Sequence, residues 1–168
     1  MVECGSTSCV CRGDVGCDGW QSANVRNDLK KAMTNQEIIQ EFEQGRAPGG
    51  SFHHADHIRV AFAYLSQYPV LEALQKFCAA LQRFAVAQGK PHLYHETITW
   101  AYLFLIRERM LRTNHPQTWE EFAAANPDLL TWERETGGIL ARYYQPETLA
   151  SAAARATFLL PDKSVSAS

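Results

Sequence analysis

The stretch that decides the fold is Val70 to Gln88, which reads VLEALQKFCAALQRFAVAQ. Leucine and phenylalanine recur in it every three or four residues, the spacing that places side chains on one face of an α-helix. The apolar face is predicted to comprise Leu71, Leu74, Phe77, Leu81 and Phe84. Gly89 follows directly and Pro91 comes two residues later, a pattern typical of one helix ending and another beginning. The stretch therefore predicts an amphipathic helix that buries one face in a core.

Helical patterns continue on both sides of this helix. Residues 34–37 and 118–121 both have the capping-box pattern that opens a helix. Further helices are predicted over residues 51–67, 92–112 and 146–154. The helix over 92–112 is apolar on almost every side between Ile98 and Ile106, so it is predicted to be the most buried element. With no β-alternation of useful length, the sequence predicts an all-α fold, a compact bundle of about four to six helices with short connections.

Composition limits the functional classes. Hydrophobic residues make up 46% and charged residues 20% of the 168-residue chain, a balance typical of a globular domain. The formal net charge of -2 generates no field that attracts nucleic acid or anionic membranes. No apolar run reaches the length of a membrane span, and the chain opens without a secretory signal pattern. We therefore expect a cytoplasmic protein that binds neither nucleic acid nor membranes.

The first 32 residues differ from the rest of the chain. They contain Cys4, Cys9, Cys11 and Cys17. The spacing C-x4-C-x-C-x5-C lacks the paired C-x2-C units typical of zinc sites, so a zinc knuckle is the less favoured interpretation. We interpret residues 1–32 as a disordered cysteine-containing leader, 33–162 as one helical domain and 163–168 as a disordered tail. Because Met33 directly precedes a helix cap, it is also a candidate for the native start.

Two helix starts are rich in histidine. Residues 51–60 read SFHHADHIRV and residues 92–97 read HLYHET. Short connections make neighbouring helices antiparallel, so these two helices are expected to begin at the same end of the bundle. His57 and His95 each precede buried-type positions by three, four and seven residues. Both side chains are therefore predicted to face the core and to meet there.

This grouping suits a metal ion. Imidazoles from His54, His57 and His95 are ligands that divalent zinc, iron, nickel or copper accepts. Asp56 or Glu96 is predicted to be a carboxylate ligand or the acceptor that orients an imidazole, and Asp56 is the one included in the predicted ligand set. A metal with three protein ligands keeps one position open for water or substrate. The main hypothesis is therefore a metal-binding protein. The open position on the metal would also allow it to be a small-molecule enzyme, whose reaction the sequence does not specify.

Two other interpretations use the same residues. Paired helix N-termini attract an anion and lower the pKa of a histidine. His57 or His95 then acts as a general base, while Arg59 holds the carboxylate or phosphate of a small anionic molecule. In the runner-up, the protein is a non-catalytic interaction or ligand-binding module. Its histidines serve there only as helix caps and as hydrogen-bond partners in the core.

Several of these residues also carry a family resemblance. The matching residues are Phe52, His54, Asp56, His57 and Arg59, then Tyr94-His95-Glu96-Thr97, then Pro161-Asp162. In this pattern residues 33–162 resemble a family of small, uncharacterised bacterial proteins without an established activity. The resemblance supports the three histidines as site residues and implies no reaction, and the cysteine leader departs from it. A fold-level analogy links the chain to DinB-like bundles, which hold a metal with three histidines in a different order.

Overall fold

The computed structural model of the chain describes residues 33–47, 52–113, 115–132 and 138–163. Residues Met33–Ser168 form one compact unit. The prediction for the leader with its four cysteines lies outside the described residues. So does the predicted tail over 163–168 except for Lys163, whose amide donates to the Tyr143 carbonyl at 3.0 Å.

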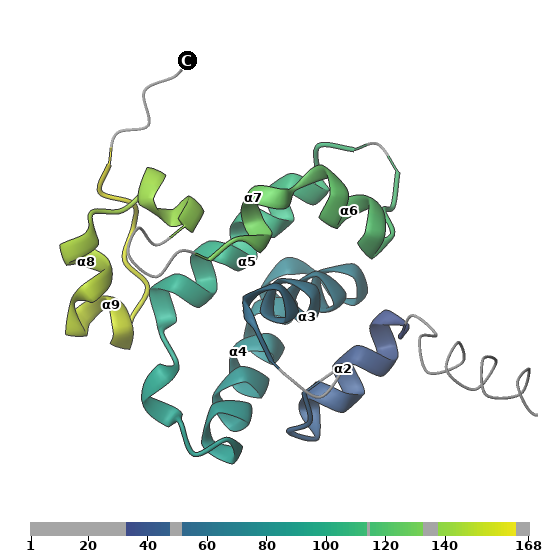
Figure 1. Ribbon diagram of the computed structural model, residues 1–168, viewed down its shortest axis with the longest axis horizontal. Coiled ribbons are helices and arrows are strands. Elements are labelled where there is room, and N and C mark those ends of the chain that lie inside the picture. Colours follow the sequence, from purple (N-terminus) through teal and green to yellow (C-terminus); the bar gives the residue numbers. More distant parts are fainter. Residues whose placement is uncertain (1–32, 48–51, 114, 133–137, 164–168) are drawn as a thin grey trace, which may run out of the picture. The chain divides into compact units, whose positions relative to one another are not determined.

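The described part of the chain is helical and contains no β-strand. Its longer helices are α2 (Asn35–Glu43), α3 (His54–Gln67), α4 (Val70–Ala87), α5 (Glu96–Met110) and α6 (Trp119–Ala125). The shorter helical segments are η1 (Pro91–Leu93), α7 (Pro127–Leu130), η2 (Gly138–Arg142), α8 (Pro146–Ala150) and α9 (Ala152–Ala156). The predicted all-α fold is confirmed, and Figure 1 shows the helices in chain order. None of the described helices combines the length and the apolar character that crossing a membrane requires.

Two helices begin at the capping boxes that the sequence indicates. At the start of α2 the Thr34 hydroxyl accepts the Glu37 amide at 3.2 Å, and the Glu37 carboxylate accepts the Thr34 amide at 2.7 Å. Thr118 and Glu121 repeat this exchange at the start of α6, at 3.2 and 2.8 Å. Each box satisfies two backbone donors that a helix N-terminus otherwise leaves without a partner.

The most deeply buried helix is α3, not α5. Every residue from Val60 to Leu65 is buried, because α3 contacts α2, α4 and α5 (Figure 1). Helix α5 instead leaves Phe104 37% exposed on its outer face, where Phe158 covers Trp100 by stacking at a centroid distance of 5.3 Å. The prediction that the helix after Pro91 is the central element is therefore wrong.

Helix α4 buries the predicted stripe with one exception. Its buried side chains are Ala73, Leu74, Phe77, Ala80, Leu81 and Phe84. Leu71, predicted on the same face, is 67% exposed. It lies six residues before Phe77, which at 3.6 residues per turn places it about 120° around the helix from the centre of the stripe. Leu71 precedes Leu74 by three residues, a spacing typical of neighbours on one helix face, and this is why the sequence pattern includes it.

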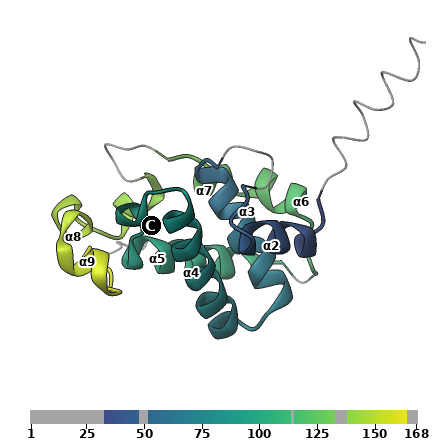
Figure 2. The same ribbon diagram turned by 90° about the horizontal axis from the view of Figure 1, so that it is seen from below.

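The C-terminal segment packs against the beginning of α5. Helix α9 contacts α5 (Figure 2). The buried Thr97 hydroxyl donates to the Thr157 carbonyl at 2.7 Å and accepts the Leu159 amide at 3.0 Å. Asp162 closes the segment by accepting the Gln145 amide at 2.8 Å. The two Thr97 bonds fix the first turn of α5. This turn forms one wall of a cleft between the helices.

Candidate functional site

An open cleft of about 970 Å³ lies between the C-terminal parts of α2 and α4 and the N-terminal parts of α3 and α5. The sequence predicts a pocket at this pair of helix starts. Its polar side chains include His53, His54, His57, Lys90, His95, Thr99 and Tyr102. Its apolar side chains include Phe52, Ile58, Phe77, Leu81, Phe84 and Ile98. A volume of this size and mixed lining are typical of a site for a small organic molecule.

Asp56 serves the start of α3. Its carboxylate accepts the backbone amide of His53, the N-cap residue, at 2.7 Å. An acidic side chain in the first turn also interacts favourably with the helix dipole. Asp56 does not line the cleft, so the structure gives it a capping role and shows no arrangement that directs it toward a metal.

His54 links two helices. Its Nε2 lies 2.9 Å from the Leu129 carbonyl of α7, and because a carbonyl only accepts, Nε2 carries the proton. The ring also packs edge-on against Tyr102 at a centroid distance of 4.9 Å. Burial lowers the pKa of His54, an effect that the bond to Leu129 partly opposes. His54 is thus a neutral hydrogen-bond donor that joins α3 to α7.

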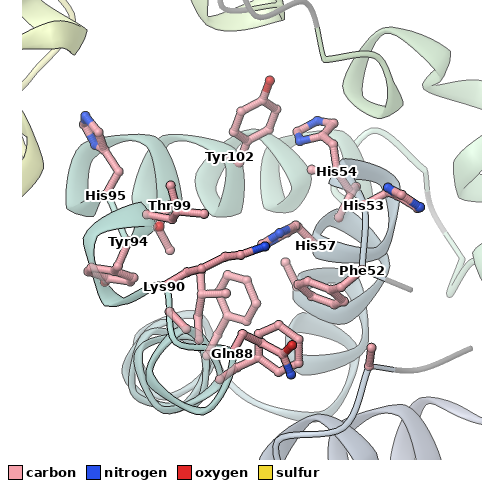
Figure 3. A pocket seen from close by; sticks show the side chains of 18 of the residues that line it. Phe52, His53, His54, His57, Gln88, Lys90, Tyr94, His95, Thr99 and Tyr102 are labelled. Carbon is pink, nitrogen blue, oxygen red and sulfur yellow. The ribbon is translucent and has the colours of Figure 1, made fainter. Parts of the chain in front are cut away.

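His57 faces the cleft with its ring nitrogens unengaged. It lies one turn inside α3 and packs on Phe52 at a centroid distance of 4.2 Å. Burial, with a smaller contribution from His54, lowers its pKa to about 4, so the imidazole is neutral at pH 7. No other described residue makes a hydrogen bond to it. Figure 3 shows its nitrogens directed into the open space between the helices.

His95 lies at the N-cap of α5 and not within the helix. The expected helix start at His92 is wrong, because Pro91 opens the 3₁₀ turn η1 and the backbone is extended at Tyr94 and His95. His95 Nδ1 accepts the Ile98 amide at 3.3 Å, and Nε2 donates to the Leu149 carbonyl at 2.9 Å. Both ring nitrogens are therefore engaged by backbone. Burial lowers the pKa of His95, and the side chain is only 6% exposed.

Arg59 points away from the cleft. Its Nη2 donates to the Met33 carbonyl at 3.4 Å, and its guanidinium lies 5.8 Å from the centre of the Trp119 ring. It does not line the cleft. The structure thus separates Arg59 from His57 and His95, the other two residues of the predicted catalytic group.

The predicted metal site has no assembled ligand set. Within the residues that the structure describes, no three His, Cys, Asp or Glu side chains form a group that could hold a metal ion. Of the four predicted ligands, His54 and His95 each donate Nε2–H to a carbonyl, and Asp56 accepts an amide. His57 keeps its ring free of such bonds and His54 keeps its Nδ1 free, so the predicted set offers two available imidazoles and no third. The donor geometry therefore lends no support to a zinc, iron, nickel or copper centre of His54, His57, His95 and Asp56.

Lys90 is a cleft residue that the sequence patterns do not indicate. This residue follows α4 in the Gly89-Lys90-Pro91 connection and lines the cleft. It forms no ion pair with any described residue. The other charged residues of the lining, Glu41 and Arg46, pair with each other at 2.6 Å, and this contact lowers the pKa of Glu41. The sequence signal for Lys90 is its position in the short turn directly before a polar helix start.

One further polar group in the lining has no partner. The Tyr102 hydroxyl is buried and makes no hydrogen bond within the described part of the chain, and the residue is only 6% exposed. Burial raises the pKa of this phenol, so it stays a neutral donor. Buried hydroxyls are normally paired, and an unpaired one beside a cleft is a group that a bound molecule or water can satisfy.

Comparison of the chain with protein-family models, curated proteins and solved structures finds no match. The resemblance to a bacterial family therefore stays a prediction, and the cleft is the feature from which a function can be inferred.

Proposed function

We propose that the chain is a ligand-binding module that takes up a small organic molecule in the cleft between α2, α3, α4 and α5. The observation that carries this proposal is His57, a mostly buried imidazole whose ring makes no hydrogen bond to the described residues and faces about 970 Å³ of open space. Polar groups taken from water cost free energy unless they are paired. The His57 nitrogens are not among the buried polar atoms without a partner, so water can reach them in the free protein, and a ligand atom in the cleft can take the place of that water.

The other histidines support binding over metal chemistry. His54 ties α3 to α7 and His95 caps α5, which are the roles that the non-catalytic interpretation of the sequence assigns to them. Both residues hold the cleft walls in place before a ligand arrives. Preorganised walls lower the entropic cost of binding, so structural histidines and an available His57 fit one and the same function.

A filled-cleft variant tests this proposal. Ala85 lines the cleft near the end of α4, and Ala79 is an exposed residue of the same helix outside the cleft. The substitution Ala85→Trp is expected to occupy the space, whereas Ala79→Trp adds the same side chain to the surface. The probe is uncharged 2-naphthylmethanol, followed by ligand-observed NMR and calorimetric titration.

Wild type and Ala79→Trp are expected to bind the probe with equal affinity, and Ala85→Trp is expected to weaken binding at least about tenfold by steric exclusion. Near-ultraviolet circular dichroism checks that all three proteins keep native packing. Equal binding by the two tryptophan variants contradicts the proposal, and so does a wild type that binds neither this alcohol nor its carboxylate and amine counterparts of the same shape.

A further inference from the structure

Resting on the proposed ligand-binding function, we infer that the cleft selects a small apolar acid, whose carboxylate is held by Lys90 and His57 and whose flat body packs against Phe52 and Phe84. This selectivity depends on three features of the lining: its charge, its hydrogen-bond donors and the position of its aromatic side chains.

The charge of the lining favours an anion. Glu41 and Arg46 neutralise each other at the rim, which leaves Lys90 as the one charged side chain of the lining without an ion-pair partner in the described residues. Figure 3 shows the Lys90 side chain extending from the turn after α4 toward the ring of His57. A cationic ligand would meet this ammonium and no free carboxylate of the lining.

The available polar groups can donate to a carboxylate. Neutral His57 carries one N–H, and the Thr99 hydroxyl makes no hydrogen bond to a described residue. Figure 3 shows Thr99 on the α5 wall and His57 on the α3 wall of the same space. A carboxylate accepts several hydrogen bonds at once, and those from an ammonium are the strongest. The three donors of the two walls and the turn therefore match one carboxylate.

Aromatic surface lies directly beside these donors. Phe52 contacts the His57 ring and also Phe84, at a centroid distance of 4.6 Å for the second pair. A flat hydrocarbon body stacks well on such a surface. The volume of about 970 Å³ is far larger than an inorganic anion needs. Both observations favour an organic acid over free phosphate.

Three naphthalene probes of equal shape test the inference: 2-naphthoate, uncharged 2-naphthylmethanol and cationic 2-naphthylmethylamine. Calorimetric titration of the full chain at pH 7 measures the three affinities. Naphthoate is expected to bind most tightly, about tenfold tighter than the alcohol, and the amine is expected to bind most weakly. Inorganic phosphate at the same ionic strength as a chloride control is expected not to compete with naphthoate.

Two matched substitutions locate the effect. Lys90→Met removes the charge and keeps the length of an exposed side chain. It is expected to weaken the binding of naphthoate about tenfold and to leave the affinity for the alcohol unchanged. Lys76→Met removes a lysine of α4 that pairs with Glu72 outside the cleft, and is expected to change neither affinity. Lys90→Arg is expected to retain most of the preference for naphthoate.

The outcomes separate the two proposals. If the amine or the alcohol binds as tightly as naphthoate, if phosphate competes, or if Lys90→Met leaves the preference intact, the inferred ligand class is wrong and the ligand-binding function stands. If none of the three probes binds wild type, the proposed function itself fails.

Discussion

The N-terminal turns of α3 and α5 contain His57 and His95, but only one of these two imidazoles is used by the fold. His57 lies one turn inside α3, where the backbone amides already have helical partners, and its ring is left to face the cleft. His95 lies at the cap of α5, where the Ile98 amide needs an acceptor, and the ring supplies it. The position of a histidine relative to the helix cap thus decides whether its imidazole supports the fold or is available to a ligand.

The largest expected effect is on stability at the α5 start. His95→Ala removes a helix cap, leaves the Leu149 carbonyl without its donor and opens a small cavity, which together should cost about 4 kcal/mol of unfolding free energy. Urea unfolding followed by circular dichroism measures the loss. His57→Ala is the matched comparison and is expected to cost clearly less, because its ring makes no hydrogen bond to a described residue. Equal losses would contradict the division of roles.

A second effect concerns pH. The folded-state pKa of His57 is about 4, below the ordinary value of about 6.5. Above pH 6.5 the imidazole is neutral in both states and stability is full. As pH falls from 6.5 to 4 the unfolded chain binds the proton and the folded protein does not, so at most about 3 kcal/mol is lost.

Urea unfolding at several pH values measures this loss, and His57→Phe serves as the comparison because it keeps a ring against Phe52. The variant is expected to lose less stability between pH 6.5 and 4 than wild type does. His54 and His95, whose pKa values burial also lowers, account for the remaining slope. Parallel pH curves for the two proteins would show that His57 is not desolvated in the fold.

The smallest expected effect is that of metal. His57 and Nδ1 of His54 are open to a divalent ion, but both ring nitrogens of His95 are engaged by backbone, so the ion must break a His95 bond before it gains a third imidazole. Addition of zinc or nickel to the chelator-treated chain is expected to raise Tm by less than about 1 °C. A rise of several degrees that disappears in His54→Ala would restore the metal hypothesis, and elemental analysis of the purified protein would then identify the ion.

Much of the fold follows from local signals in the sequence. The capping boxes at Thr34 and Thr118 and the stripe of α4 are set by neighbouring residues, and the structure confirms them apart from Leu71, which is exposed. The α5 start differs because it depends on partners distant in the chain. His95 bonds to Leu149 and Thr97 bonds to Thr157, and no periodicity within residues 92–112 reports those contacts.

The residues of the candidate site also divide into those placed by local sequence signals and those placed by contacts with distant parts of the chain. Helical phase indicates that His57 points inward, since it lies within a helix whose bounds the sequence indicates well. His95 is buried as phase predicts, but it lies at the helix cap, and phase does not indicate that backbone groups engage both of its ring nitrogens. Phase also gives no information about Lys90, which belongs to a turn. The orientation of Arg59 follows from its contact with Trp119. Trp119 lies sixty residues later in the chain, and no pattern in the sequence indicates this contact.

The bonds from Thr97 and His95 to the C-terminal segment have a consequence for how the protein is made. Synthesis proceeds from the N-terminus, so α3, α4 and the polypeptide of α5 leave the ribosome before residues 145–162 do. Until that segment emerges, the first turn of α5 lacks the carbonyl and amide groups that it bonds in the finished fold. The nascent chain therefore completes this cleft wall only after residues 145–162 have emerged.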